Sequence, residues 1–314
     1  MGVALAVLDA IGHTPLLRVR LSGIAAGVEL WAKCEWQNPG GSVKDRAALS
    51  LVTEGIRSGT LRAGKTIIDS SSGNTAVGLA LVGAAMGYPV ELLMPENASP
   101  DRRRRCEAYG AQITLTDAFS GSDGAIVQVR DKVAAEPGRY FYADQYRNPA
   151  NPLAHYRSTG PEIWNQTQGR VTHFVAGLGT SGTVMGTGRY LRECHPGVRI
   201  VAVEPDQPLH GLEGLKHMAS SIVPGIYHEE ELDDKISVAT EDAYAMVYRL
   251  SQEEGILVGQ SSGAAMFATL KTARKLHEGT LVTVFPDFGD KYLSTNLWVG
   301  WRDRMAVGNL TFSI

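Results

Sequence analysis

The clearest indication of fold class in this sequence is the segment His173-Phe174-Val175-Ala176-Gly177-Leu178-Gly179-Thr180-Ser181-Gly182-Thr183. His173–Ala176 is apolar and predicts a strand, and Gly182–Glu193, after the glycine-rich turn, predicts a helix. A strand that passes through a tight turn into a helix is the repeating unit of buried, mostly parallel sheets. Free backbone N–H groups at such a helix start suit a phosphate or another anion.

The same alternation of strands and helices continues on both sides of this segment. The other predicted strands are Val28–Cys34, Thr66–Ile68, Val90–Met94, Gln112–Leu115, Arg199–Val203 and Leu281–Phe285. The other predicted helices are Thr75–Met86, Asp101–Tyr109, Ala125–Ala135, Asp242–Glu254 and Ala264–His277. We therefore predict an α/β protein whose sheet is mostly parallel and covered by helices. The length of 314 residues suits two lobes, and the turn-rich Asn148–Pro152 is the predicted junction.

Composition argues against several classes of protein. The sequence is 44% hydrophobic, which supports sizeable cores, and its net charge of −3 gives no reason to expect nucleic acid as a partner. The three scattered cysteines, Cys34, Cys106 and Cys194, suit a reducing, cytoplasmic compartment better than a disulfide framework. Met1–Ala10 is too short and lacks the basic region of a signal peptide, and no run approaches the ~18 apolar residues of a membrane span. The apolar Asn309–Ile314 is expected to pack against another surface.

A second informative run is Asn38–Arg46 (NPGGSVKDR), which places Lys44 just inside a predicted helix start. Its proline and glycines predict a loop, and Ser42 is the predicted N-cap. A lysine at this position lies near the positive end of a helix dipole, which disfavours the ammonium form and lowers the pKa. A neutral amine can act as a nucleophile, a Schiff-base former or a general base. For a lone lysine, a solvated surface position is the alternative interpretation.

Two further turns combine hydroxyl side chains and glycine at predicted helix starts. Ser70–Thr75 (SSSGNT) follows a strand, and its hydroxyls, amide and backbone N–H groups suit a carboxylate or another anion. Gly259–Ala265 (GQSSGAA) places two serines at the start of a late helix. Helix N-capping also explains either turn when that turn is considered by itself.

The glycine-rich turn also fits a different class of enzyme. Gly177, Gly179 and Gly182 have the G-x-G-x-x-G spacing of dinucleotide-binding folds, and Glu204 ends the next strand, where a ribose-binding acid belongs. A nicotinamide-dependent dehydrogenase is therefore a rival hypothesis. It leaves Lys44 and the Ser70–Thr75 turn without a role.

Together, the lysine, the two anion-binding turns and the late serine suit pyridoxal 5'-phosphate. This cofactor needs an amine for its aldehyde, donors for its phosphate and a partner for its ring nitrogen. The order and sequence of the motifs resemble the cysteine synthase and cystathionine β-synthase family of fold type II pyridoxal-phosphate enzymes. The resemblance runs from Gly12–Leu16 (GHTPL) to Lys291–Thr295 (KYLST). Met94–Asn97 (MPEN), Phe174–Thr180 (FVAGLGT) and Gly214–Met218 (GLKHM) are most similar to the bacterial cysteine synthase B branch, and we expect neither the haem segment nor the regulatory modules of the animal cystathionine β-synthases.

The resemblance implies roles for residues of this chain. Lys44 is implied to be the Schiff-base lysine and the catalytic base, with Asn74 at the cofactor's phenolic oxygen and Ser261 at its pyridine nitrogen. A phosphate cup is implied at five successive residues, Gly179, Thr180, Ser181, Gly182 and Thr183. The substrate α-carboxylate is implied to bind Ser71, Ser72, Asn74, Thr75 and Gln145. Lys216 either binds a substrate phosphate or an anionic sulfur donor or is a surface lysine, and no metal site is expected.

The resemblance further implies two lobes, each a mostly parallel twisted sheet flanked by helices. Residues 1–12 and 38–148 are expected to form a smaller, mobile lobe that carries Lys44 and the substrate-carboxylate turn. Residues 13–37 and 149–314 are expected to form a larger lobe that carries the phosphate cup and the serine for the pyridine nitrogen.

The chain departs from the family motif at two positions. Ser71 stands where threonine is usual, and Ala76 stands where glycine is usual. We expect the extra methyl of Ala76 to lie beside the site, so that both departures bear on substrate choice. The basic run Arg102–Arg105 is interpreted as a solvated helix face.

The implied reaction is that of cysteine synthase. An O-activated L-serine, either O-acetylserine or O-phosphoserine, exchanges its β-substituent for sulfur from a sulfide donor and becomes L-cysteine. The alternative within the family is cystathionine β-synthase activity, from serine and homocysteine, and a non-catalytic binding partner is a further alternative. The leaving group and the sulfur donor stay open. We also expect a homodimer, with a serine-activating enzyme or a sulfur-carrier protein as candidate protein partners.

Overall fold

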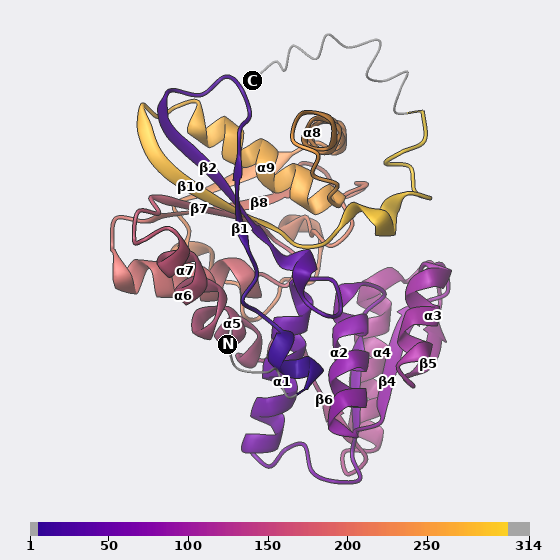
Figure 1. Ribbon diagram of the computed structural model, residues 1–314. Coiled ribbons are helices and arrows are strands. Elements are labelled where there is room, and N and C mark those ends of the chain that lie inside the picture. The colour runs from indigo at the N-terminus through magenta and orange to yellow at the C-terminus, as the bar shows by residue number, and fades with distance from the viewer. Residues whose placement is uncertain (1–5, 301–314) are drawn as a thin grey trace.

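Two separate sheets carry the fold of residues 6–300, which are the part of the chain that this computed structural model describes (Figure 1). The larger sheet has six strands in the order β1-β2-β10-β7-β8-β9, and the smaller sheet has four in the order β5-β4-β3-β6. All pairs are parallel except β1 with β2. The expectation for Asn309–Ile314 lies outside the described residues.

The larger sheet is covered by helices on both faces. Its strands are β1 (Leu16–Val19), β2 (Gly27–Cys34), β7 (His173–Gly177), β8 (Arg199–Pro205), β9 (Asp234–Val238) and β10 (Glu278–Phe285). In Figure 1, α8 (Thr240–Glu253) and α9 (Gln260–Ala273) lie on one side of this sheet, and α6 (Thr159–Gln166) and α7 (Gly182–Cys194) lie on the other. Two hydrophobic cores result, one on each face.

The smaller sheet is built in the same way. Its strands are β3 (Thr66–Ser70), β4 (Val90–Pro95), β5 (Gln112–Thr116) and β6 (Tyr140–Tyr142). The helices around it are α1 (Lys44–Arg57), α2 (Asn74–Met86), α3 (Pro100–Ala108) and α4 (Gly121–Ala135). Helix α5 (Ala150–Arg157) packs against both α1 and α7 and so joins the two halves. Short 3-10 turns complete the described part, at Val7–Ala10, Glu35–Gln37, Met218–Ser220, Glu229–Glu231 and Gly289–Tyr292. No helix within residues 6–300 has the length and apolar character needed to cross a membrane.

Each strand predicted from the sequence is present, but several elements were missed. The unpredicted elements are β1, β6, β9, α5 and α6. The helix predicted at Ala264–His277 begins earlier, at Gln260, and ends at Ala273. The sequence analysis placed Gly263 in a turn, but it lies inside α9. Glycine is needed there because α8 packs closely, and a Cβ would stand 2.2 Å from the carbonyl oxygen of Ala243. Of the predicted turn Asn148–Pro152, residues 150–152 belong to α5.

A buried carboxyl group, Asp69, ties β3 to the segment after β6. Its side chain accepts hydrogen bonds from the backbone N–H groups of Ser70, at 2.7 Å, and Gln145, at 3.2 Å. Burial raises the pKa of Asp69 to about 7, because the low-dielectric interior disfavours the carboxylate more than these two donors favour it.

We predict that Asp69→Asn flattens the pH dependence of stability. The folded-state pKa lies above the ordinary 3.8, so the stability that Asp69 contributes is complete below about pH 3.8 and is lost as the pH rises through about 7. Thermal unfolding of the holoenzyme at about pH 5 and about pH 8 measures this loss, which the variant should not show.

The matched control is Glu91→Gln, another buried carboxyl group of the smaller sheet. Although burial opposes it, hydrogen bonds from Lys132 and two hydroxyls hold the pKa of Glu91 below its ordinary value. The stability that Glu91 contributes is therefore lost only in acid. The change in melting temperature of Glu91→Gln between about pH 5 and about pH 8 should match that of the wild type. If Asp69→Asn lost as much thermal stability between these two pH values as the wild type does, the prediction would be contradicted.

Candidate active site

One cavity of about 560 Å³ brings together the segments singled out in the sequence. It lies where the turns after β3 and β7 face each other, as expected for the carboxyl ends of parallel strands. The expected site residues that line it are Lys44, Ser71, Ser72, Asn74, Thr75, Gln145, Gly179, Thr180, Thr183, Lys216 and Ser261. Ser181 and Gly182 are buried behind this lining.

Lys44 is the first residue of α1 and opens onto the cavity. The helix starts one residue later than predicted, with Val43 rather than Ser42 at the N-cap, although the Ser42 hydroxyl still accepts a hydrogen bond from the Lys44 N–H at 3.2 Å. Burial lowers the pKa of Lys44, and the carboxylate of Asp287 partly opposes this shift. The amine is therefore more easily neutral than that of a surface lysine.

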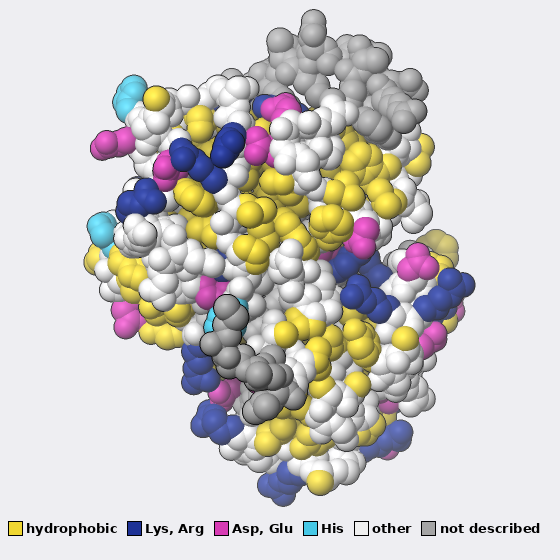
Figure 2. Space-filling model, in the orientation of Figure 1, with side chains coloured by type: hydrophobic (Ala, Val, Ile, Leu, Met, Phe, Trp, Pro, Cys, Tyr) yellow, Lys and Arg dark blue, Asp and Glu magenta, His cyan; other side chains and the backbone are white. Residues whose placement is uncertain are grey.

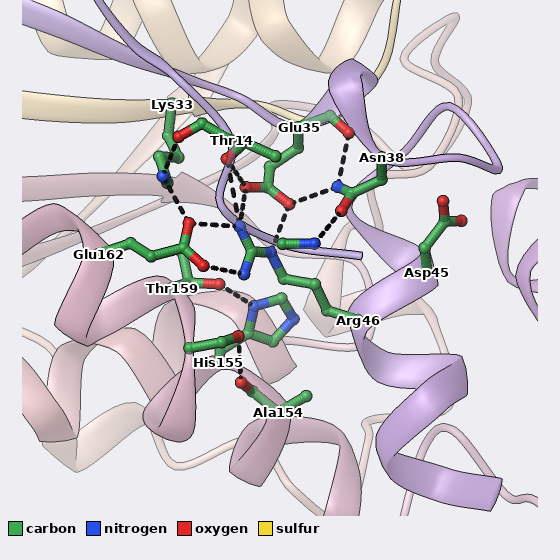
Figure 3. A network of polar contacts seen from close by, with 12 residues as sticks. Thr14, Lys33, Glu35, Asn38, Asp45, Arg46, Ala154, His155, Thr159 and Glu162 are labelled. Carbon is green, nitrogen blue, oxygen red and sulfur yellow. Dashed lines mark hydrogen bonds and ion pairs between the residues drawn. The ribbon is translucent and has the colours of Figure 1, made fainter. Parts of the chain in front are cut away.

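The start of α1 is anchored by a buried ion-pair network (Figure 3). The Arg46 side chain, 2% exposed, donates to both oxygens of Glu35 at 2.7 and 2.8 Å and to both oxygens of Glu162 at 2.6 and 2.8 Å. Lys33 pairs with Glu162 at 2.6 Å. Burial opposes it, but the hydrogen bonds from Arg46 and Lys33 bring the pKa of Glu162 down to about 2. This network binds the first turn of α1, which carries Lys44, to the end of β2 and to α6.

The turn Gly179–Thr183 has the features of an anion site. Among the described residues, none accepts a hydrogen bond from its five backbone N–H groups. The Ser181 hydroxyl is buried and has no hydrogen-bond partner, and Ser181 has the left-handed backbone φ of 72°. Gly182 is required by close packing, because a Cβ there would stand 2.0 Å from Oδ1 of Asn151. These orphaned donors at the start of α7 fit a phosphate group.

Two side chains behind this turn hold its threonines. Asn151 donates to the Thr180 hydroxyl at 3.0 Å, and His155 Nε2 lies 3.3 Å from the Thr183 hydroxyl. The other ring nitrogen of His155 contacts Thr159 at 2.9 Å (Figure 3). Burial, with a further contribution from Arg46, lowers the pKa of His155 to about 3, so its ring is neutral at ordinary pH.

The Ser70–Thr75 turn is fixed by hydrogen bonds from both halves of the molecule. The Thr75 hydroxyl donates to Gln145 Oε1 at 2.7 Å, and Gln145 Nε2 donates to the Ser70 carbonyl at 3.0 Å. Asn74 Nδ2 donates to Asp287 Oδ2 at 2.7 Å, although these residues are 213 positions apart. The turn is therefore held open toward the cavity at the start of α2.

The two departures from the family motif behave differently. Ser71 lines the cavity, and its hydroxyl accepts a hydrogen bond from the Gly73 N–H at 3.2 Å. The expectation that the Ala76 methyl lies beside the site is wrong. Ala76 is 1% exposed and belongs to the hydrophobic core of the smaller sheet, because its position on α2 turns it away from the cavity.

Ser261 lines the cavity from the larger sheet. It is the second residue of α9, follows the N-cap Gly259, and is 6% exposed. Ser261 thus lies at the positive, N-terminal end of a helix.

Two ion pairs lie at the cavity mouth and join its two sides. Lys216 pairs with Asp123 on α4 at 3.2 Å and lies 5.3 Å from the ring centre of Tyr146. Arg102 on α3 pairs with Glu213 at 2.6 Å and stacks over the ring of Tyr292. The prediction of a solvated face was therefore wrong for Arg102, whose side chain is 17% exposed and lines the cavity. Figure 2 shows Lys and Arg side chains gathered where the helices of the smaller sheet meet the upper half of the molecule.

Glu204, the acid that the dehydrogenase hypothesis requires, is already occupied. It is 7% exposed, accepts a hydrogen bond from the Met218 N–H at 3.1 Å and pairs with Lys235 at 3.4 Å. It does not line the cavity. The structure thus offers no ribose-binding carboxylate at this position. Within residues 6–300, no group of His, Cys, Asp or Glu has the arrangement of a metal site.

Sequence reasoning missed Arg102 and Tyr292, which line the cavity, and Asp287 and Lys291, which contact the cavity residue Asn74. Their contacts are with residues far away in the chain, which no local pattern reveals. The one available signal was the run Lys291–Thr295, which was part of the family resemblance and had no role attached to it.

Comparison with known proteins agrees with this geometry. Residues 7–287 match the family model described as pyridoxal-phosphate dependent enzyme. A cysteine synthase of Aquifex aeolicus is 53% identical over 93% of this chain and 91% of its own length, and cysteine synthase B of Salmonella typhimurium is 41% identical over 92% and 94%. The crystal structure of cysteine synthase from Entamoeba histolytica superimposes with a TM-score of 0.91 at 37% identity, over 95% of this chain and 91% of that chain. The match of most of the chain shows that it belongs to the family of pyridoxal-phosphate dependent enzymes.

Proposed function

We propose that this protein is a cysteine synthase, which exchanges the β-substituent of an O-activated L-serine for sulfur. The observation that carries the proposal is the meeting in one cavity of Lys44, a turn with orphaned N–H donors and the hydroxyl-rich turn Ser70–Thr75. The two curated relatives described above are both cysteine synthases and match over more than nine-tenths of the chain.

Pyridoxal 5'-phosphate fits the residues around the cavity. The N–H groups of Gly179–Thr183 and the unpaired Ser181 hydroxyl would hold its phosphate at the start of α7. Lys44 would form the covalent link to its aldehyde carbon, and Asn74 would donate to its phenolic oxygen. When bound, the cofactor supplies an electron-withdrawing ring that takes up charge developing at the substrate Cα.

The Lys44 amine, freed when the amino group of the substrate takes its place in the link, would serve as the base that moves the Cα proton of the substrate. A base must be neutral to accept a proton, and burial lowers the pKa of Lys44 in that direction. The nearby Asp287 carboxylate favours the ammonium that forms once the proton has been taken. The same amine returns the proton to Cα after sulfur has bonded to Cβ.

The substrate is held at the start of α2. Its α-carboxylate would accept hydrogen bonds from the Ser71, Ser72 and Thr75 segment, with Gln145 and Asn74 beside it. The bond from Cβ to oxygen breaks, and its electron pair leaves with acetate or phosphate. A sulfur nucleophile forms the new bond to Cβ, so one substituent replaces the other without net oxidation or reduction.

Ser261 would select this reaction type. A hydroxyl facing the pyridine nitrogen cannot keep that nitrogen protonated as a carboxylate would. The ring is then a weaker acceptor of charge, which favours loss and replacement of a β-substituent over transamination.

The alternative within the family is cystathionine β-synthase activity, with serine and homocysteine as substrates. We favour the O-activated serines because two cations, Lys216 and Arg102, lie at the cavity mouth. An anionic leaving group or a small anionic sulfur donor suits these cations better than a neutral hydroxyl does.

The remaining proposals concern organisation. Residues 1–12 and 38–148 would form a smaller lobe that moves against the larger lobe when the carboxylate binds.

A homodimer is supported by Figure 2, which shows hydrophobic side chains gathered around β1, whose Leu17 is 38% exposed. A reducing, cytoplasmic location is proposed from the three free cysteines. A serine-activating enzyme or a sulfur-carrier protein stays the candidate protein partner.

The first test of this function is the covalent link. Borohydride reduction followed by peptide mass analysis should find the cofactor on the peptide that contains Lys44. Lys44→Ala should show no such label, because the amine that forms the link has been removed. The exposed Lys275→Ala is the control and should be labelled like the wild type. Wild-type labelling of another lysine in Lys44→Ala would contradict the assignment.

A second test concerns the leaving group. If Lys216 contacts a substrate phosphate, Lys216→Ala should lower kcat/KM for O-phosphoserine by roughly 10- to 150-fold, because a charge-assisted hydrogen bond is lost. O-acetylserine, whose acetyl group carries no charge while it is attached, should be affected much less. The measurement is the ratio of the two kcat/KM values.

Asp123→Asn provides the matched control for Lys216. It removes the carboxylate that pairs with Lys216 at 3.2 Å and keeps an oxygen for the Ile222 N–H. The freed ammonium should raise the preference for O-phosphoserine, which is the opposite direction. Equal losses for both donors in Lys216→Ala would exclude the phosphate contact.

A further inference from the structure

Two residues that the proposed function does not place against the cofactor or the substrate, Asp287 and Lys291, hold both ends of the Asn74 amide. Asn74 Nδ2 donates to Asp287 Oδ2 at 2.7 Å, and Lys291 Nζ donates to Asn74 Oδ1 at 2.9 Å. A carboxylate only accepts hydrogen bonds and an ammonium only donates them. The amide therefore satisfies both partners in a single orientation, and a flipped amide would satisfy neither.

Asp287 is itself held in place. It is 1% exposed, and the oxygen that accepts from Asn74 also accepts from the Tyr292 hydroxyl at 2.7 Å. Its other oxygen lies against Gly259, where a Cβ would stand only 2.4 Å away. Gly259 is the N-cap of α9, and a helix start favours a neighbouring negative charge. The missing side chain at Gly259 thus makes room for the carboxylate.

Lys291 connects three segments that are distant in the sequence. Its ammonium donates to the Gly41 carbonyl at 2.8 Å and to Asn74, and it lies 3.9 Å from Asp287. Its side chain is 13% exposed. The loop before Lys44, the start of α2 and the turn after β10 therefore meet at one ammonium.

We propose that Asp287 and Lys291 are positioning residues that keep the Asn74 amide nitrogen available as a donor to the cofactor's phenolic oxygen. One N–H of Asn74 is used by Asp287, and the second N–H is left for the cavity that Asn74 lines. An unclamped amide would also present its carbonyl oxygen, which repels an oxygen anion. The inference rests on the proposed function, which assigns Asn74 to that oxygen.

The test is a double-mutant cycle on cofactor binding. The dissociation constant of pyridoxal 5'-phosphate is measured by titrating it into the cofactor-depleted protein for the wild type, Asn74→Ala, Asp287→Ala and the double variant. Each single substitution should weaken binding by roughly 10-fold or more, since a hydrogen bond to a charged group is lost. Because Asp287 acts through Asn74, the double variant should bind no more weakly than Asn74→Ala alone.

Two further variants separate positioning from charge and from general stability. Asp287→Asn keeps a carbonyl oxygen for the Asn74 N–H and should stay within about threefold of the wild type. If Asp287 acted only as a counter-ion of Lys44, Asp287→Asn would lose as much affinity as Asp287→Ala, and the proposal would be wrong. Glu91→Ala is the matched control, because Glu91 is 1% exposed and also accepts from a tyrosine, Tyr140, and a lysine, Lys132. It lies on β4 outside the cavity and should lower the melting temperature without changing cofactor affinity.

The outcomes distinguish this inference from the function beneath it. Additive losses in the double variant would overturn the positioning role and leave the role of Asn74 intact. An unchanged dissociation constant in Asn74→Ala would overturn both. If Asp287→Ala does not fold, the cycle is repeated with Lys291→Met, which removes the contact at the other end of the amide and should show the same non-additivity.

Discussion

The buried charge of Arg46 is the constraint around which the rest of the molecule is arranged. Its guanidinium is paired with Glu35 beyond β2 and with Glu162 on α6, and pulling any of them apart would leave an uncompensated charge in the interior. The first turn of α1 is therefore bound to the larger sheet. The rest of the same helix packs with α2 over the smaller sheet. Helix α1 thus joins the larger sheet to the hydrophobic core of the smaller sheet, and Lys44 lies at this junction.

The position of the cavity beside this junction is set by the topology of the two sheets. Parallel strands end at the same edge of their sheet, so the turns after β3 and β7 each present a helix start to the space between the sheets. Both helix starts carry unpaired N–H groups, and both are attractive to anions. A substrate with a carboxylate and a cofactor with a phosphate can therefore be held from opposite sides. Lys44, which we propose as the catalytic base, comes from a third helix start, that of α1.

The parts of the site that the sequence predicts are those encoded locally. Lys44 and the two turns each belong to a short run in which strand, glycine and hydroxyl residues succeed one another. Asp287 had no such signal, because its partner Asn74 lies 213 positions away and only the folded chain brings them together. Ala76 shows the complementary failure. The motif reveals that a methyl has been added, but the phase of α2 decides that the methyl points into the core.

The ion pairs at the cavity mouth affect which anions can bind there. Lys216 and Arg102 are already paired with Asp123 and Glu213. An entering anion must therefore displace one of these carboxylates before it can pair with either cation. Its gain is the difference between two ion pairs, the one that it forms and the one that it displaces. Abundant monovalent ions such as chloride gain little from that exchange. A ligand that engages the cation and the turns behind it at the same time gains from both, so the mouth selects by the number of groups a ligand presents.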